Sequence, residues 1–187
     1  MKYGHFYHYF ELETGPFRSL SALTEEEAAA VMDKLMQDGG VFASKRSPDY
    51  MPIRRQLEKQ ARDMFLAKGG KPILEYPHSM TYGPCEWIRN WFREGRELRV
   101  PVDAFDPTVV SFTYGDLFPA LRFQDGKPYR GQVYTMEEIS RVIELFGWPQ
   151  EWNASGRFGP ERYVEVQVWD ETLIKDIQAD RPLNFLR

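Results

Sequence analysis

The sequence predicts an α+β fold in which one sheet, mixed or antiparallel, is flanked by helices. Strand-like and helix-like segments are intermixed along the chain, and several connections between strands are too short for a regular βαβ series. No internal repeat, low-complexity stretch or linker divides the chain. We therefore expect residues 1–187 to form a single α+β domain.

Composition and charge narrow the class of protein. The chain is 42% hydrophobic and 15% aromatic, which is sufficient for a core without disulfides. Its net charge of −4 argues against general nucleic-acid binding. The single cysteine, Cys85, excludes an internal disulfide framework, and no apolar run approaches the roughly 20 residues of a membrane span. With no signal peptide visible, we expect a soluble, cytoplasmic protein.

The first third of the chain predicts a strand followed by two helices. Residues 3–10 form an aromatic strand that ends at the turn around Gly15. Thr24 and Glu27 have the spacing of a capping box, which predicts a helix to about residue 36. The second helix begins near residue 47 or 52 and runs to Lys68, with an apolar stripe at helical spacing.

Four basic residues of the second helix lie mostly off its apolar stripe and could meet a phosphate backbone. Acidic side chains are interspersed with them, which favours a solvated face of mixed charge. The basic residues are Arg54, Arg55, Lys59 and Arg62, and the acidic ones are Asp49, Glu58 and Asp63.

The middle of the chain is expected to carry the main wall of the sheet. Residues 85–94 predict a short helix and residues 98–102 a strand. Residues 109–114 are rich in β-branched and aromatic side chains and predict a buried, central strand. A turn at residues 125–128 and a strand-like run through Tyr134 would complete an adjoining hairpin.

The last third predicts one more strand between two helices. Thr135 and Glu138 form a second capping box, and the helix that they open ends at Gly147. Residues 148–160 read as an irregular loop, residues 161–169 as an alternating strand and residues 171–178 as a short helix.

Glu165 is the first candidate for a catalytic residue. Strand alternation places it on the same face as Tyr163 and Trp169, between two aliphatic neighbours that face the other way. A carboxylate within a buried strand is unfavourable unless it is paired or functional. The alternative is that this face of the strand is solvated.

A second group of candidates lies on the expected central strand and hairpin. Tyr114, Asp116 and Arg130 combine aromatic rings, which stack on bases, with charged groups, which pair with phosphate or hydroxyls. The same composition also describes an ordinary hairpin. No phosphate-binding glycine motif accompanies these residues.

The two histidines of the first strand give no metal site. His5 and His8 are three residues apart, so their side chains point to opposite faces of the strand and cannot easily share an ion. Each could be a nucleotide contact or a general base, or simply part of a polar strand edge.

The chain resembles a family of uncharacterised bacterial proteins, a likeness that brings no assigned function. The segments that carry it are KGGKP at 68–72, SFTYGD at 111–116, DGKPYRGQVYT at 125–135, PQEWN at 149–153 and GPERYVEVQVW at 159–169. The order of shorter features is also similar to that of ADP-ribosyltransferases of the DNA-modifying toxin type. These features are His5-Phe6-Tyr7-His8, Met80-Thr81-Tyr82-Gly83-Pro84 and Val164-Glu165-Val166.

The second resemblance implies a reaction with NAD as donor of ADP-ribose. His5 would contact the nicotinamide ribose, Tyr82 would stack on nicotinamide, and Glu165 would stabilise the positive charge that forms on the ribose. Tyr7 departs from the threonine of that family's first motif. The alternative is a binding module without enzymatic activity, which holds a small ligand or a partner protein through the aromatic and arginine-bearing stretch.

Overall fold

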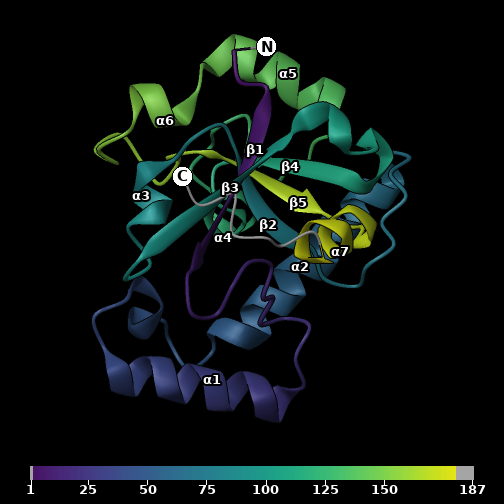
Figure 1. The fold of residues 1–187 in the computed structure, drawn as a ribbon. Helices are drawn as coiled ribbons and strands as arrows, with labels where there is room; N and C mark the ends of the chain where they lie inside the picture. Colours follow the sequence, from purple (N-terminus) through teal and green to yellow (C-terminus); the bar gives the residue numbers. More distant parts are fainter. Residues whose placement is uncertain (1, 180–187) are drawn as a thin grey trace.

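The fold is α+β, built on a five-stranded antiparallel sheet with the strand order β3-β1-β2-β5-β4 (Figure 1). The structure is a computed structural model, and it describes residues 2–179. The predicted fold class is thus confirmed. The strands are β1 (His5–Glu11), β2 (His78–Tyr82), β3 (Gly95–Pro101), β4 (Val110–Tyr114) and β5 (Val164–Val168).

The helices begin and end close to the predicted positions where capping signals were present. Thr24 and Thr135 each accept a hydrogen bond from the backbone N–H three residues later, and Gly39 and Gly147 follow the last turns. The helices are α1 (Glu25–Asp38), α2 (Tyr50–Ala67), α3 (Glu86–Arg89), α4 (Leu117–Arg122), α5 (Met136–Phe146), α6 (Pro149–Trp152) and α7 (Thr172–Ala179).

One face of the sheet carries the main apolar core. Val164, Val166 and Val168 of β5 point into it, because alternate residues of a strand face the same side. Helices α5 and α7 cover this face, contributing Ile139 and Ile174 among others. In Figure 1, α5 lies at the end of the molecule opposite α1.

The other face of the sheet is covered by separate apolar clusters. Leu57 and Phe65 of α2 pack with Leu117 of α4 and with Trp169, which follows β5. A further cluster joins Tyr9 of β1 with Ile88 of α3. The strand residues between these clusters are polar, and they form the floor of the site described below.

The prediction of a central strand at residues 109–114 with an adjoining hairpin is wrong in two respects. Strand β4 lies at the edge of the sheet, beside β5 only, although both of its faces are buried. The chain then enters helix α4, and Tyr134 pairs with Phe112 as an isolated bridge and not as part of a second strand. Pro119 obscured this helix in the sequence, yet it stands in the first turn, where its missing N–H removes no helical hydrogen bond.

The chain between residues 85 and 101 also differs from the prediction in its boundaries. Helix α3 is a single turn, and strand β3 begins at Gly95, three residues before the expected start. The extra residues pair with Glu11, Phe10 and Tyr9 of β1. Strand β3 therefore starts earlier than predicted because β1 extends far enough to pair with these residues.

Candidate functional site

A row of polar side chains crosses the second face of the sheet. Glu165 lies directly opposite Thr81 of β2 on one side and Thr113 of β4 on the other. All three are buried. Because directly opposed residues share a face, this register puts Glu165 at the centre of the row. The predicted division of the strand into two faces is correct, and the polar face is not solvated.

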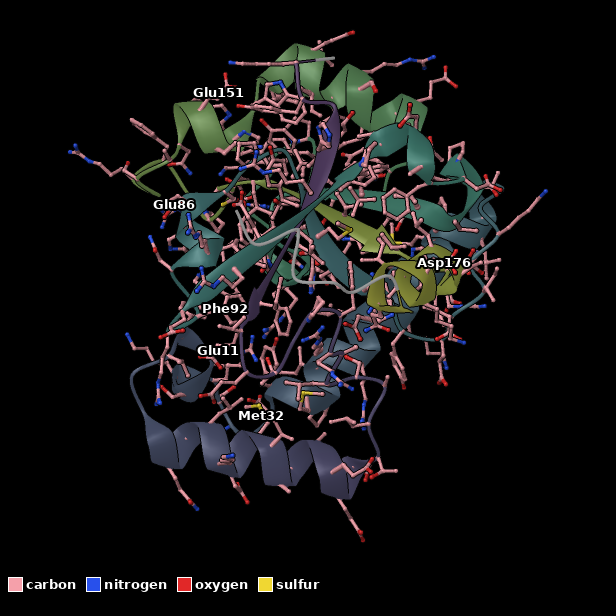
Figure 2. All side chains as sticks on the ribbon, viewed as in Figure 1. Glu11, Met32, Glu86, Phe92, Glu151 and Asp176 are labelled. Carbon is pink, nitrogen blue, oxygen red and sulfur yellow. The ribbon has the colours of Figure 1, made fainter. Side chains whose placement is uncertain are left out.

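Thr81 and Glu165 of this row line a cavity of about 340 Å³. The volume is within the range of small-ligand sites in proteins. The cavity extends from Glu165 past the turn after β1 towards α1, so that Glu11 and Phe92, labelled in Figure 2, line its side nearer α1. The charged residues that line the cavity include Arg46, Arg54, Glu58, Asp116 and Glu165.

Glu165 is only 6% exposed, and hydrogen bonds hold its side chain in place. Its Oε2 accepts a hydrogen bond of 2.7 Å from the backbone N–H of Leu117, and the hydroxyl of Ser79 donates another. Burial raises the pKa of Glu165 to about 8, and the carboxylate of Asp116 adds to the effect. The side chain therefore holds a proton at neutral pH.

Asp116 is fixed at the start of α4. Its Oδ1 accepts a hydrogen bond of 2.9 Å from the N–H of Phe118, and its Oδ2 accepts one of 2.9 Å from the hydroxyl of Tyr163. Burial, together with Asp116, raises the pKa of Tyr163 well above its usual value, so the phenol remains a donor. Two carboxyl groups with different partners thus face the same cavity.

Helix α2 contributes a buried ion pair to the opposite wall. Nε of Arg54 donates to Oε1 of Glu58 at 2.8 Å, and the second guanidinium donor approaches the hydroxyl of Tyr50 at 3.4 Å. Glu58 is 1% exposed, and its Oε2 has no hydrogen-bond partner among the described residues. A free, buried carboxylate oxygen beside a cavity is a position where a ligand donor would be stabilised.

The prediction of a solvated, mixed-charge face on α2 is therefore wrong for Arg54 and Glu58. These two residues lie one helical turn apart at the edge of the apolar stripe. Their side chains point inward and line the cavity. Their spacing of four residues and the position of Glu58 next to buried Leu57 were the available signals in the sequence.

His8 also lines the cavity, in a neutral and oriented form. Its Nε2 accepts a hydrogen bond of 2.8 Å from the N–H of Phe17, so the proton lies on Nδ1, which donates to the carbonyl of Ser79 at 3.1 Å. Burial lowers the pKa of His8 to about 4. Both ring nitrogens are thus engaged by the backbone.

Two residues that the resemblance assigns to NAD lie away from this cavity. His5 is exposed and does not line it, and its carbonyl accepts a hydrogen bond from Gly83. Tyr82 is 1% exposed and packs against Phe6 and Trp148 in the core on the opposite face of the sheet. The structure brings neither of them to Glu165.

Tyr114 and Arg130 are also held by other parts of the fold. The hydroxyl of Tyr114 donates to the carbonyl of Gly147 at 2.8 Å, at the end of α5. Arg130 makes a bidentate pair with Asp125, with both distances 2.9 Å, and a further ion pair with buried Glu161. Among the six sequence candidates, only Asp116 and Glu165 line the cavity.

Comparisons with models of protein families, with curated proteins and with solved structures found no match to this chain. Within residues 2–179, no three His, Cys, Asp or Glu side chains gather closely enough to hold a metal ion. None of the helices in that part of the chain is both long and apolar enough to span a membrane.

Proposed function

We propose that this protein is an enzyme that binds a small polar molecule in the cavity and exchanges a proton with it through Glu165. The observation that supports this most is the position of Glu165, a buried carboxyl with a pKa of about 8 that lines the cavity. A catalytic acid or base is most effective when its pKa lies near the working pH. Below about pH 8 the group would donate a proton, and above it the group would accept one.

The neighbouring groups suit the recognition of a polar substrate. The free Oε2 of Glu58 would accept a hydrogen bond from an amide or amine of the ligand. Asp116, which Tyr163 and Phe118 hold in place, would keep Glu165 protonated by its negative charge. We therefore propose a neutral substrate with both a hydrogen-bond donor and a basic oxygen or nitrogen.

The transfer of ADP-ribose from NAD gains no support from this arrangement. That reaction would need His5 and Tyr82 beside Glu165, and Tyr82 faces the opposite core. NAD as a donor stays a prediction from the resemblance alone. A binding function without chemistry uses the same cavity and is favoured by one observation, the hydrogen bonds from Leu117 and Ser79 that fix Glu165.

A screen by thermal shift would test the proposal with a library of small neutral amides, ureas and alcohols. We expect compounds that stabilise the wild-type protein more at about pH 6 than at about pH 9, because protonation of Glu165 changes between them. Glu165→Gln should remove this pH dependence, whereas Glu144→Gln, an exposed control on α5, should retain it.

The outcomes of this screen separate the two functions. Ligands that bind the wild-type protein and Glu165→Gln equally well, with no dependence on pH, would favour binding without proton exchange. If no compound stabilised the wild-type protein at either pH, the cavity would not be a site for this class of molecule. Any ligand found is then a lead for an assay of turnover.

A further inference from the structure

A second groove, of about 520 Å³, runs beside the cavity and has a different chemical character. It shares a wall with the cavity around Arg46, Tyr50 and Asp116. Its remaining surface comes from α3, α4, the segment before α2 and the loop between α6 and β5. Glu165 is not among the residues that line this groove.

Aromatic rings form two walls of the groove. On one side Phe42 is stacked on Trp91 at 4.1 Å between ring centroids, and Trp87 meets Trp91 edge to face at 4.9 Å. On the other side Tyr50 and Phe118 are stacked at 5.1 Å with nearly parallel rings. Part of each wall is accessible, and Phe42 is 40% exposed. Such surfaces are suited to a flat aromatic ligand.

An arginine lies over each aromatic wall. The guanidinium of Arg46 is 4.2 Å from the ring centroid of Tyr50, and that of Arg162 is 4.2 Å from the ring of Trp87. Stacking on a ring leaves the edge of a guanidinium free to donate hydrogen bonds. Lys45, which is exposed, adds a third cation to the lining.

Positive charge exceeds negative charge in this groove. Within the described residues, the side chains of Lys45 and Arg46 make no ion pair, and Arg162 donates only to the carbonyl of Ala154. Among the described residues that line the groove, Asp116 is the single carboxylate, and Phe118 and Tyr163 already donate hydrogen bonds to it. A basic groove in a chain with a net charge of −4 is a local feature that attracts anions.

We propose that this groove binds a phosphorylated aromatic compound of the size of a mononucleotide. The phosphate pairs with Arg46, Arg162 and Lys45, which supply charge-assisted hydrogen bonds. The base lies against the ring of Phe42, which is 40% exposed, and stacking there is tolerant of base identity. The volume of 520 Å³ holds one nucleotide and not a folded nucleic acid.

Isothermal titration calorimetry with AMP, GMP, CMP and UMP tests this proposal. At least one mononucleotide should bind with a dissociation constant below about 1 mM. It should bind at least about tenfold more tightly than its nucleoside, which lacks the phosphate. It should also bind at least about tenfold more tightly than ribose 5-phosphate, which lacks the base. Affinity should also fall as the ionic strength rises.

Variants distinguish the groove from the cavity. Arg46→Met and Arg162→Met keep the apolar stems and should each weaken binding about tenfold or more, since a charge-assisted hydrogen bond is lost. Arg141→Met, an exposed control on α5, should bind as the wild type does. Thermal melting of each variant confirms that it is folded.

Any of four results would overturn the proposal. The first is the absence of binding by any of these mononucleotides at about 5 mM, and the second is equal binding of nucleoside and nucleotide. The third is full affinity in both arginine variants. Binding of an oligonucleotide without binding of mononucleotides also overturns it, in favour of a nucleic-acid surface. None of these results bears on Glu165, which is tested separately in the cavity.

Discussion

Oε2 of Glu165 and the backbone nitrogen of Leu117 lie 2.7 Å apart, in a hydrogen bond that joins the middle of β5 to the first residue of α4. The preceding residue, Asp116, is the N-cap of that helix and holds its own hydrogen bonds to Phe118 and Tyr163. One helix start thus positions two carboxyl groups towards one cavity. Burial of Glu165, together with the negative charge of Asp116, keeps a proton on Glu165.

Glu165 should make the protein less stable as the pH rises. Its pKa is about 8 in the folded protein and 4.5 in the unfolded chain, so the folded state binds more protons between these values. The stabilisation is complete below about pH 4.5 and is lost as the pH rises through about 8. Over this window the loss is at most about 5 kcal/mol by proton linkage.

Glu165→Gln should remove this loss, because glutamine cannot ionise and still accepts the hydrogen bond from Leu117. Urea unfolding across the window measures the free energy of unfolding of both proteins. We expect the free energy of unfolding of the variant to increase relative to that of the wild type as the pH rises. The control Glu144→Gln should follow the wild type, and parallel curves for all three proteins would contradict the prediction.

His8 should destabilise the protein at acidic pH. Burial lowers its pKa from 6.5 to about 4, so the unfolded chain binds the extra proton between these values. Stability is therefore lost as the pH falls from about 6.5 towards 4, by roughly 3 kcal/mol at most. His8→Gln should lack this loss, whereas His5→Gln, at an exposed position of the same strand, should show it in full.

The comparison of these two histidine variants uses their unfolding curves at several pH values. If the loss of stability on the acid limb of the wild-type curve were the same in His8→Gln, groups other than His8 would be responsible for it. If His5→Gln removed it instead, the assignment of the acid limb to His8 would be wrong. Chemical shifts of the His8 ring would report its protonation directly.

Asp116→Asn should lower the pKa of Glu165 towards its ordinary value, since the negative charge of Asp116 is one cause of the rise. Asparagine is also a favourable N-cap, so helix α4 should be retained. The measurement is the titration of the Glu165 carboxyl by carbon NMR in both proteins. An unchanged pKa would show that burial alone sets it.

Arg130→Met should reduce stability by about 2 kcal/mol and leave ligand binding unaffected, because its buried partner Glu161 loses one of two cations. Lys127 remains beside Glu161 at 2.9 Å and limits the loss. Chemical unfolding of the variant, with Arg141→Met as the exposed control, measures the effect. Equal stability of both variants would contradict a structural role for Arg130.

Local signals in the sequence predicted much of the fold. The capping boxes at Thr24 and Thr135 and the alternation around Glu165 each depend on residues a few positions apart. The edge position of β4 was not predictable in this way, because sheet order depends on contacts between distant segments. Helix α4 was missed because Pro119 within a short apolar run resembles a break.

The site was predictable only in part, for a related reason. Glu165 and Asp116 were identified from their chemistry and their place beside strands, and both line the cavity. Arg46 and Arg54 come from segments far from them in the chain and became part of the site only through the packing of α2. His5, in contrast, was chosen by resemblance and lies at an exposed strand end.

The measurement that tests the central proposal most directly is the titration of Glu165 in the wild-type protein by NMR of its side-chain carboxyl carbon. Glu165→Gln assigns the resonance by its absence. Proton exchange in the cavity predicts an apparent pKa of about 8 for this group. A value near 4.5, the ordinary pKa of a glutamate, would contradict it.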